Sequence, residues 1–372
     1  MERILLSANN SFVLYNFRFG LMKELEKNYE VVCLAGKDSS CEEIKKNGWN
    51  FIEIFLDRKG KNIYKDLVLF FNYLKIYKKE KPCCILHYTI KPNIYGTIAA
   101  RILKIPVINN VTGLGDTFNE ANLTNKIVKL LYRIAFKFPE KVFFQNDDDM
   151  NLFLNNNLII KEKCARIPGS GVNLTKFVAK KKYRSDEQTI FLFLGRISNN
   201  KGVRIVNEIS KIMVTKNPNV EFWLLGKIYS DEENHISEEE LKDWETKSNI
   251  KYLGTSKDVR EQIKEANCII FPSFYREGVP RSLIEAAAME KPILTTDNVG
   301  CRDIVEDGYN GFLAKPNDMA SMLKIVEKFL SLSKEEKKIM GLNGRKKAEQ
   351  EFDEKIVIEK YLETIKMVKK RS

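Results

Sequence analysis

Short apolar segments alternate with amphipathic segments along nearly the whole chain, and this alternation constrains the fold more than any other feature. Runs such as RILLSA, YEVVCLA and CCILHY have the length and composition of buried strands. Amphipathic stretches with helical spacing follow them, as at residues 63–80. Strands that alternate with helices predict parallel sheets covered by helices, which defines the α/β class.

The alternation comes in two series. The first fills the N-terminal half, and KKKYRSDEQ at 180–188 has the composition of an exposed linker. The second begins at TIFLFLG and ends in a helical tail from about residue 318. We therefore predict two Rossmann-like domains, 1–174 and 175–354, whose parallel sheets face a cleft. Such sheets bind ligands at the carboxyl ends of their strands.

The net charge of +12 is concentrated in the first half of the chain. Residues 1–176 contain 27 Lys and Arg against 18 Asp and Glu, a net charge of +9, whereas residues 177–372 contain 35 against 32, a net charge of +3. A cationic domain could face anionic lipid, a diphosphate-bearing substrate or nucleic acid. The alternative is that the chain is rich in lysine and that the positive charge lies on solvated helix faces without a binding role.

Composition excludes several classes of protein. The hydrophobic content of 44% and the charged content of 30% are typical of a globular chain, and no apolar run approaches the length of a membrane span. The seven cysteines are scattered without a C-x-x-C spacing, so we expect a reduced, cytoplasmic protein without a zinc or disulfide framework.

The most informative motif is YREGVPRSLIE at 275–285, directly after the strand-like run CIIFPS. A Gly-Val-Pro turn that leads into a helix leaves backbone N–H groups available for an anion. We expect Pro280 at the first helical position, where a missing N–H has no cost. Glu277 and Glu285 flank this turn, and carboxylates accept hydrogen bonds from sugar and ribose hydroxyls. The alternative is that the two glutamates are ordinary surface residues on either side of a helix cap.

A second motif, GRISNNKG at 195–202, follows the strand-like run FLFL. Arg196 and Lys201 could both reach one diphosphate from a loop above the sheet, since both side chains are usual phosphate ligands. An ordinary basic turn is the alternative. The two motifs together favour a nucleotide diphosphate sugar as ligand.

The first half carries weaker candidates for an acceptor site. Gly113 and Gly115 follow the run PVINN, where glycines allow a ligand to approach the backbone closely. Asn16 and Arg18 follow the first strand, and Arg18 could meet an anionic acceptor or lie on a helix surface. Lys91 is a further cleft candidate.

Two other polar features favour structural interpretations. His87 ends an apolar strand, where a single histidine is more often structural than catalytic. Asp147, Asp148 and Asp149 resemble a D-x-D metal motif, but they open a predicted helix, so capping and dipole compensation explain them.

At this point the sequence resembles a known family. EGVPRSLIE after a strand, with GRISNNKG upstream, is similar to the retaining glycosyltransferases of family 4, which have the GT-B fold. YNFR, TIKPNIYG, INNVTGLGD, VFFQN and PGSGVN resemble a bacterial subgroup that builds capsule, O-antigen or lipid-linked glycans. Some of those enzymes add GalNAc to an undecaprenyl-diphosphate sugar. The resemblance covers nearly the whole chain, and it implies a last helix, about 355–372, that crosses back onto the first domain.

The resemblance also implies roles by position. Glu277 matches a glutamate at the donor sugar, and Glu285 matches one that holds the ribose. Arg196 and Lys201 match the pair on the donor diphosphate. Further donor-site positions, which include backbone N–H donors and a contact to the base at Val259, are Gly195, Val259, Gly278, Val279, Pro280, Ser282 and Leu283.

One position departs from the family pattern. Many members carry a first-domain histidine near the donor sugar, and Ile90 occupies that position here. His87 lies three residues earlier and does not align with it. A step assisted by histidine is therefore not expected.

The resemblance implies a retaining transferase that needs no metal ion or other cofactor. The donor would be a UDP-sugar, with GalNAc favoured, and the acceptor a sugar on a polyprenyl diphosphate. The partners would be these two substrates and an anionic membrane surface, on the inner face of the plasma membrane.

Two alternatives stay open. A UDP-sugar 2-epimerase shares the two-domain fold, but it would be expected to carry several carboxylates and a histidine in the cleft. A basic nucleic-acid-binding protein would explain the charge, yet no interleaving of aromatic and basic residues is visible, so we expect no nucleic-acid partner.

Overall fold

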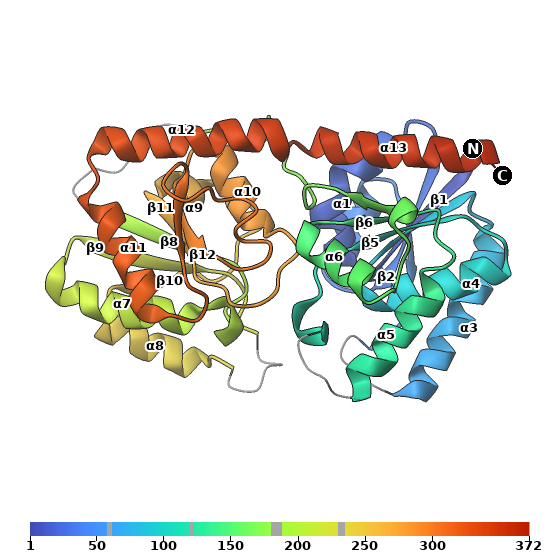
Figure 1. The fold of residues 1–372 in the computed structure, drawn as a ribbon, viewed down its shortest axis with the longest axis horizontal. Helices are drawn as coiled ribbons and strands as arrows, with labels where there is room; N and C mark the ends of the chain where they lie inside the picture. The colour runs from blue at the N-terminus through green and yellow to red at the C-terminus, as the bar shows by residue number, and fades with distance from the viewer. Residues whose placement is uncertain (58–61, 119–122, 180–187, 230–234, 372) are drawn as a thin grey trace. The chain divides into compact units, whose positions relative to one another are not determined.

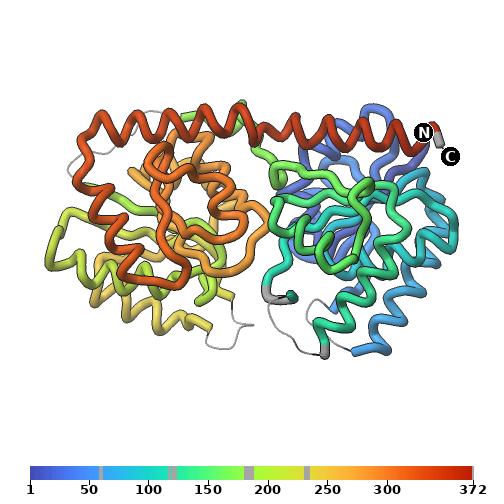
Figure 2. Tube along the Cα trace, viewed as in Figure 1, coloured from blue at the N-terminus to red at the C-terminus, as the bar shows by residue number. Residues whose placement is uncertain are grey.

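The computed structural model describes residues 1–57, 62–118, 123–179, 188–229 and 235–371 (Figures 1 and 2). These residues form two compact units. Unit 1 comprises Met1–Ser170 and Glu354–Ser372, and unit 2 comprises Gly171–Asp353. The division lies within a few residues of the boundaries drawn from the sequence. Most of the linker expected at 180–188 falls outside the described residues.

Unit 1 is built on a seven-stranded parallel sheet with the order β3-β2-β1-β4-β5-β6-β7. Its strands are β1 (Arg3–Asn10), β2 (Glu30–Gly36), β3 (Asn50–Glu53), β4 (Cys84–Tyr88), β5 (Val107–Val111), β6 (Lys141–Phe144) and β7 (Cys164–Arg166). The central strand β1 aligns Leu5 with Val32 on one side and with Ile85 on the other. Successive side chains of a strand point to opposite faces, so both faces of this apolar sheet must be covered.

Helices cover the two faces of this sheet. One face carries α1 (Ser11–Leu25), α2 (Ser40–Lys46) and the C-terminal α13 (Glu354–Arg371), which share one apolar core. The other face carries α3 (Ile63–Glu80), the π-helical turn η1 (Pro92–Gly96), α4 (Thr97–Ile102), α5 (Leu123–Ala135) and α6 (Asp147–Asn155). Two short 3₁₀ turns, η2 (Gly115–Phe118) and η3 (Lys161–Lys163), complete the unit. The last helix therefore belongs to the first unit, as expected.

Unit 2 contains a six-stranded parallel sheet with the order β10-β9-β8-β11-β12-β13. Its strands are β8 (Thr189–Leu194), β9 (Val220–Leu225), β10 (Ile250–Tyr252), β11 (Cys268–Phe271), β12 (Ile293–Thr296) and β13 (Gly311–Ala314). Its helices are η4 (Asn199–Lys201), α7 (Val203–Lys216), α8 (Glu238–Lys247), α9 (Arg260–Glu265), α10 (Arg281–Ala288), α11 (Met319–Ser331) and α12 (Lys334–Glu351). The helices α7 and α11 contact each other, as do α10 and α12.

The α/β class and the two parallel Rossmann-like sheets are confirmed. The helix α1 begins at Ser11, because the Asn10 side chain accepts a hydrogen bond from Val13 N (3.2 Å) and caps the helix there. The edge strand β13 was not predicted, since its four residues directly follow a turn and give no alternating pattern.

Candidate active site

Two loops of unit 2 bring their charged residues together at the carboxyl ends of neighbouring strands. One loop follows β8 and carries Arg196 and Lys201, and the other follows β11 and carries Glu277. The ammonium group of Lys201 makes a direct ion pair with the carboxylate of Glu277. These side chains are 7% and 13% exposed, so the pair is largely shielded from water. The structure therefore brings Lys201 and Glu277 of the two predicted motifs together within unit 2.

Backbone hydrogen bonds fix the two loops against each other. The carbonyl of Asn200 accepts from Phe274 N and Tyr275 N, each at 3.1 Å. The buried Ser273 hydroxyl donates to Glu277 Oε1 (3.1 Å). Glu277 is thus held from two sides, which limits its rotamers and pre-organises its carboxylate.

The pKa of Lys201 is lowered from its ordinary value of 10.5. Burial of the ammonium group is the largest cause, and the charge of Arg196 acts in the same direction. The Glu277 carboxylate opposes both by favouring the charged form. Lys201 therefore lies in a desolvated place, where Arg196 adds a second positive charge and Glu277 a negative one.

Aromatic rings lie beside these cations. The Arg196 guanidinium lies 4.8 Å from the ring centre of Tyr229 and 5.8 Å from that of Tyr275. Lys201 Nζ lies 4.8 Å from the same Tyr275 ring. Because aromatic faces attract cations, Tyr275 helps to hold both positive groups in one place. Sequence reasoning missed Tyr229 and Tyr275, although Tyr275 stands two residues before Glu277.

Glu285 lies in α10 and pairs with Arg281, one turn earlier, at 2.8 Å. Burial raises the pKa of the Glu285 carboxyl above its ordinary value of 4.5, whereas the Arg281 charge acts to lower it. The proposed contact of Glu285 with ribose stays a prediction.

The start of α10 differs from the prediction in two respects. Pro280 is the N-cap residue, and the first helical residue is Arg281. Leu283 N donates to Pro280 O (3.1 Å), so Leu283 does not offer the open N–H that was expected. Ser282 lies in the first turn, and Gly278 and Val279 form the loop before it.

Gly300 is a site residue that sequence reasoning did not identify. Its φ of +82° lies in the left-handed region, and a Cβ there would approach Gly278 O to 2.1 Å and Glu277 Cβ to 2.9 Å. The backbone after β12 therefore packs directly on the Glu277 loop. The glycine in DNVG after a strand was a usable signal, because close backbone approach requires glycine.

The remaining donor-site predictions occupy the same unit. Gly195 directly follows β8, and its N–H donates to Leu225 O (3.0 Å). Val259 is the N-cap residue of α9 and packs against the apolar core of unit 2. Both lie after the carboxyl ends of strands, and their contacts with a nucleotide stay predictions.

In unit 1, Arg18 is buried rather than at the helix surface. It is 2% exposed, its guanidinium carbon lies 4.5 Å from the ring centre of Tyr88, and its Nε and Nη1 atoms have no hydrogen-bond partner among the described residues. Buried guanidinium N–H groups without hydrogen bonds are costly unless an anion or water meets them. Asn16, two residues earlier, donates to Phe12 O (3.1 Å) within α1.

The loop after β4 shows backbone strain. Thr89 has a φ of +69°, which is rare for a β-branched residue, and Asn9 N donates to its hydroxyl (3.2 Å). Lys91 follows and pairs with Asp66 of α3 at 2.6 Å, and Tyr95 OH donates to the same carboxylate (2.8 Å). Lys91 therefore has a protein carboxylate beside it.

Both glycines of the pair after β5 have positive φ angles. Gly113 has a φ of +111° and Gly115 a φ of +53°. Both values favour glycine. Neither angle tests a contact with an acceptor.

His87 is a structural residue. Its Nε2 lies 2.8 Å from Tyr77 OH and its Nδ1 lies 3.0 Å from Asn109 Oδ1, with Thr97 Oγ1 at 3.3 Å. Burial lowers the pKa of His87 to about 3, so the ring is neutral at ordinary pH. A buried, neutral, bonded imidazole is not placed to exchange protons with a substrate.

The aspartates at 147–149 lie at the start of a helix whose N-cap residue is Asn146. They form the first turn of α6, and the Asn146 side chain accepts from Asp149 N (2.7 Å). Among the described residues, no group of three His, Cys, Asp or Glu is arranged to hold a metal ion.

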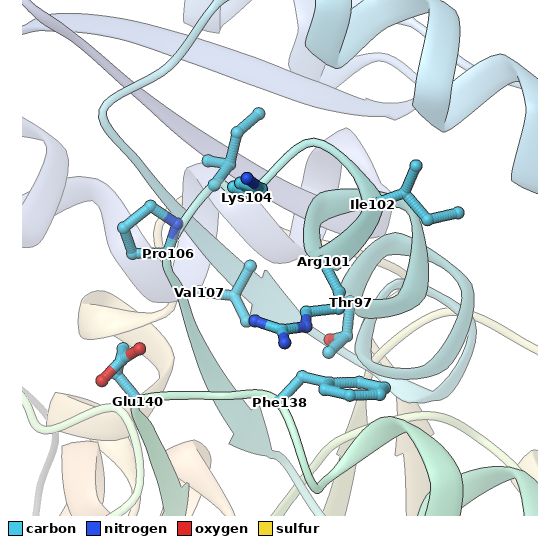
Figure 3. A pocket seen from close by; sticks show the side chains of 9 residues that line it. Thr97, Arg101, Ile102, Lys104, Pro106, Val107, Phe138 and Glu140 are labelled. Atoms are coloured by element: carbon cyan, nitrogen blue, oxygen red, sulfur yellow. The ribbon is translucent and has the colours of Figure 1, made fainter. Parts of the chain in front are cut away.

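A separate pocket of about 360 Å³ lies in unit 1, at the amino ends of the strands β5 and β6 (Figure 3). Its walls come from α4, the start of β5 and the loop before β6, and Arg101 lies 5.4 Å from the Phe138 ring centre beside it. None of the predicted site residues lines it. Since parallel sheets bind ligands at the carboxyl ends of strands, this pocket is not the candidate active site.

Comparison with known proteins identifies the family. Residues 3–146 match the model "Glycosyl transferase 4-like", and residues 175–347 match "Glycosyl transferases group 1". The chain belongs to the glycosyltransferases. The matched segments correspond to units 1 and 2 in turn, and the second contains Arg196, Lys201, Glu277 and Glu285.

Several relatives act on lipid-linked sugars. The transferase is 28% identical over 369 residues, 94% of each chain, to the N,N'-diacetylbacillosaminyl-diphospho-undecaprenol alpha-1,3-N-acetylgalactosaminyltransferase of Campylobacter jejuni. It is 26% identical over 278 residues, 70% of each chain, to the UDP-Gal:alpha-D-GlcNAc-diphosphoundecaprenol alpha-1,3-galactosyltransferase of Escherichia coli.

Solved structures share the GT-B fold. A glycosyltransferase from Rickettsia africae has a TM-score of 0.80 at 19% identity and covers 100% of this chain and 99% of its own. Anabaena Alr3699/HepE in complex with UDP-glucose has a TM-score of 0.80 at 16% identity and covers 99% and 100%. In the parts of this transferase that are described, no helix has the length and apolar character to cross a bilayer.

Proposed function

We propose that this transferase moves a hexose or N-acetylhexosamine, with GalNAc favoured, from a UDP-sugar to a sugar carried on a polyprenyl diphosphate. One observation carries the donor part of the proposal. Lys201 and Glu277 meet at the carboxyl ends of β8 and β11, with Arg196 sharing the Tyr275 ring with Lys201. Two cations beside a shielded carboxylate fit a diphosphate attached to a hydroxyl-rich sugar.

The ion pair also suggests how the charges of the site are balanced. Lys201 and Glu277 neutralise each other in a largely desolvated place. When donor binds, Lys201 and Arg196 would turn toward the diphosphate, and Glu277 would accept a hydrogen bond from a sugar hydroxyl. Each charge-assisted hydrogen bond would contribute roughly 1.5–3 kcal/mol.

We propose a retaining reaction that needs no metal ion. The acceptor hydroxyl attacks the anomeric carbon from the face that UDP leaves, the bond between that carbon and the phosphate oxygen breaks, and the hydroxyl proton passes to the departing phosphate. Arg196 and Lys201 would stabilise the negative charge that grows on the diphosphate. Transfer that continues in excess EDTA supports this proposal, and loss that added Mg²⁺ or Mn²⁺ restores contradicts it.

The acceptor part of the proposal is supported by the relatives and by Arg18. Two relatives are named for sugar acceptors on diphosphoundecaprenol. Arg18 supplies a guanidinium whose Nε and Nη1 atoms have no hydrogen-bond partner among the described residues, and residues 1–176, which contain most of unit 1, carry a net charge of +9. We propose that it turns toward the carboxyl edge of the sheet and meets the acceptor diphosphate, with Asn16, Lys91, Gly113 and Gly115 on the same side. The reaction would take place on the inner face of the plasma membrane.

The test is a donor screen with and without acceptor. UDP-Glc, UDP-Gal, UDP-GlcNAc and UDP-GalNAc are each incubated with a short-chain polyprenyl-diphosphate sugar, and both the glycolipid product and its anomeric configuration are determined. An α-linked product from one donor supports the proposal. A product of inverted configuration contradicts retention. Formation of a 2-epimer from UDP-GlcNAc without acceptor would instead favour the epimerase.

A further inference from the structure

Two helices of unit 1 expose large apolar side chains to solvent. The helix α3 exposes five of them over its first nine residues, namely Ile63 (75%), Tyr64 (75%), Leu67 (52%), Val68 (42%) and Phe71 (62%). The helix α5 exposes three more, Ile127 (48%), Leu130 (53%) and Ile134 (42%). We call these eight side chains the apolar face. Single exposed apolar residues are normal, but contiguous groups mark interaction sites.

The spacing places each group on one side of its helix. Ile63, Leu67 and Phe71 repeat every four residues, and Leu130 and Ile134 do the same. The opposite sides of α3 and α5 bury Tyr73 and Tyr132 in the cores of the unit. Both helices are therefore already packed, and the apolar face is a second, outward surface.

The exposed charged residues of the helices α3 and α5 themselves are all basic. On α3 they are Lys65, which pairs with Asp57 (3.0 Å), Lys75, Lys78 and Lys79, and on α5 they are Lys126 and Arg133. The only acidic residues of α3, Asp66 and Glu80, point inward and pair with Lys91 (2.6 Å) and Arg3 (3.4 Å), and α5 has none. A helix with apolar side chains flanked by Lys and Arg is the pattern that binds an anionic lipid surface.

The apolar face also lies at the appropriate edge of the unit. Both α3 and α5 contact η1, on the same face of the sheet, and Figure 1 shows them running in the same direction. The Asp66–Lys91 pair joins the N-terminal half of α3 to the loop after β4. The apolar residues of α3 therefore lie beside the carboxyl end of β4, where an acceptor would bind in a parallel sheet.

We propose that the apolar face of α3 and α5 inserts into the headgroup region of an anionic bilayer and sets unit 1 beside its lipid-linked acceptor. This inference rests on the proposed function for the identity of the acceptor. The side chains would enter the interface, while the lysines would contact anionic headgroups. Insertion would keep the diphosphate-linked sugar at the level of the sheet edge.

Vesicle flotation of the full chain tests this without any substrate. Vesicles contain phosphatidylcholine alone or mixed with phosphatidylglycerol. We expect flotation with the anionic vesicles, a decrease as salt is raised, and a fall of about tenfold or more for the double variant Leu67→Ser and Phe71→Ser. The matched control is Ile339→Ser and Leu342→Ser on α12, which are 48% and 44% exposed in unit 2 and should float like the wild type.

The outcomes separate this proposal from its alternatives. Equal flotation of both double variants, or no flotation of the wild type, overturns it. A wild-type dimer that becomes a monomer in the Leu67→Ser and Phe71→Ser variant, with no effect on flotation, assigns the surface to a second copy instead. Circular dichroism and thermal melting of each variant show that it is folded. A chain that floats but transfers no sugar to a lipid-linked acceptor would leave the surface in place and refute the proposed function.

Discussion

Lys201 and Glu277 form a direct ion pair although 76 residues separate them in the sequence. Both side chains are largely shielded, so removing one partner leaves the other as an uncompensated charge. Breaking a buried pair in this way costs about 3–5 kcal/mol in typical cases. Functional tests at this pair must therefore separate lost chemistry from lost stability.

The substitution Glu277→Gln keeps the size of the side chain and an oxygen that can accept from Lys201. We expect turnover to fall about 100-fold or more, equivalent to about 2.7 kcal/mol of transition-state stabilisation. The neutral amide cannot balance the Lys201 charge or bind the sugar hydroxyl as strongly. Steady-state kinetics with the best donor of the screen measure the effect, and a melting curve shows whether the variant is folded at the assay temperature.

A matched control is Glu239→Gln, an exposed glutamate of α8 in the same unit. Its kinetics should match those of the wild type. Turnover within a few-fold of the wild type for a folded Glu277→Gln variant would remove Glu277 from the active site.

Gly300 offers a test of the packing behind the ion pair. An alanine there would bring its Cβ to 2.1 Å from Gly278 O, so the Glu277 loop must move. We expect Gly300→Ala to weaken UDP binding about tenfold or more, because a small misplacement of binding groups is enough for such a loss. Isothermal titration with UDP measures it.

Gly308→Ala is the control for backbone strain. Gly308 has a similar φ of +79°, but a Cβ there meets nothing within 4 Å. It should lose about 1–2 kcal/mol of stability from the left-handed conformation and keep its UDP affinity. If both variants bind UDP equally well, Gly300 does not position the donor loop.

The fold was predictable because its signal is local and repeated. Buried parallel strands such as β8 appear as continuous apolar runs, and helices such as α3 show their period in the sequence. β13 was missed, since a short edge strand gains its conformation from pairing with β12 and not from its own pattern.

The site was predictable only in part, for a similar reason. Glu277 and Lys201 stand in motifs whose charged residues and glycines indicate a binding site for a diphosphate sugar. The ring of Tyr229 and the close approach of Gly300 depend on loops that are distant in sequence. The burial of Arg18 also comes from tertiary packing on Tyr88, which no window of α1 could reveal.

The buried His87 predicts a pH dependence of stability. Its pKa is about 3 in the folded chain, so on unfolding at acidic pH the imidazole takes up a proton that the folded state does not hold. Stability from this group is therefore full above the unfolded pKa of about 6.5 and falls as pH decreases, by about 2 kcal/mol at about pH 5. Urea unfolding above about pH 6.5 and at about pH 5 measures the difference in the free energy of unfolding.

The variant His87→Gln should show a smaller loss of stability between those pH values, since the titrating group is gone. Its catalytic activity should stay within a few-fold of the wild type where it is folded, because the imidazole makes only internal contacts. A large loss of turnover with unchanged folding would contradict the structural role of His87.

Glu285 predicts a pH dependence of donor binding. Burial raises its pKa above 4.5, so the carboxylate takes up its proton at a higher pH than an exposed glutamate does. If the carboxylate accepts hydrogen bonds from ribose, UDP affinity is full well above the raised pKa and falls as pH decreases toward it. Titration of UDP at several acidic pH values should show this decrease for the wild type and a flatter profile for Glu285→Gln.

Arg18 gives the sharpest separation of stability from function. Its guanidinium is 2% exposed, with two nitrogens that lack partners among the described residues, so it carries a desolvation cost that its contact with Tyr88 offsets only in part. Arg18→Met keeps the length of the side chain and removes the charge. We expect its melting temperature to stay the same or rise.

The same variant should lose acceptor binding. With a short-chain, water-soluble polyprenyl-diphosphate sugar, we expect kcat/KM for the acceptor to fall about tenfold or more, because a hydrogen bond to a charged group contributes roughly 1.5–3 kcal/mol. Hydrolysis of the UDP-sugar without acceptor should stay within about twofold, since Arg18 is proposed to contact the acceptor and not the donor. Arg101→Met, an exposed arginine of unit 1, is the control and should change neither rate. A stable Arg18→Met enzyme with full acceptor transfer would show that the buried charge serves the fold alone.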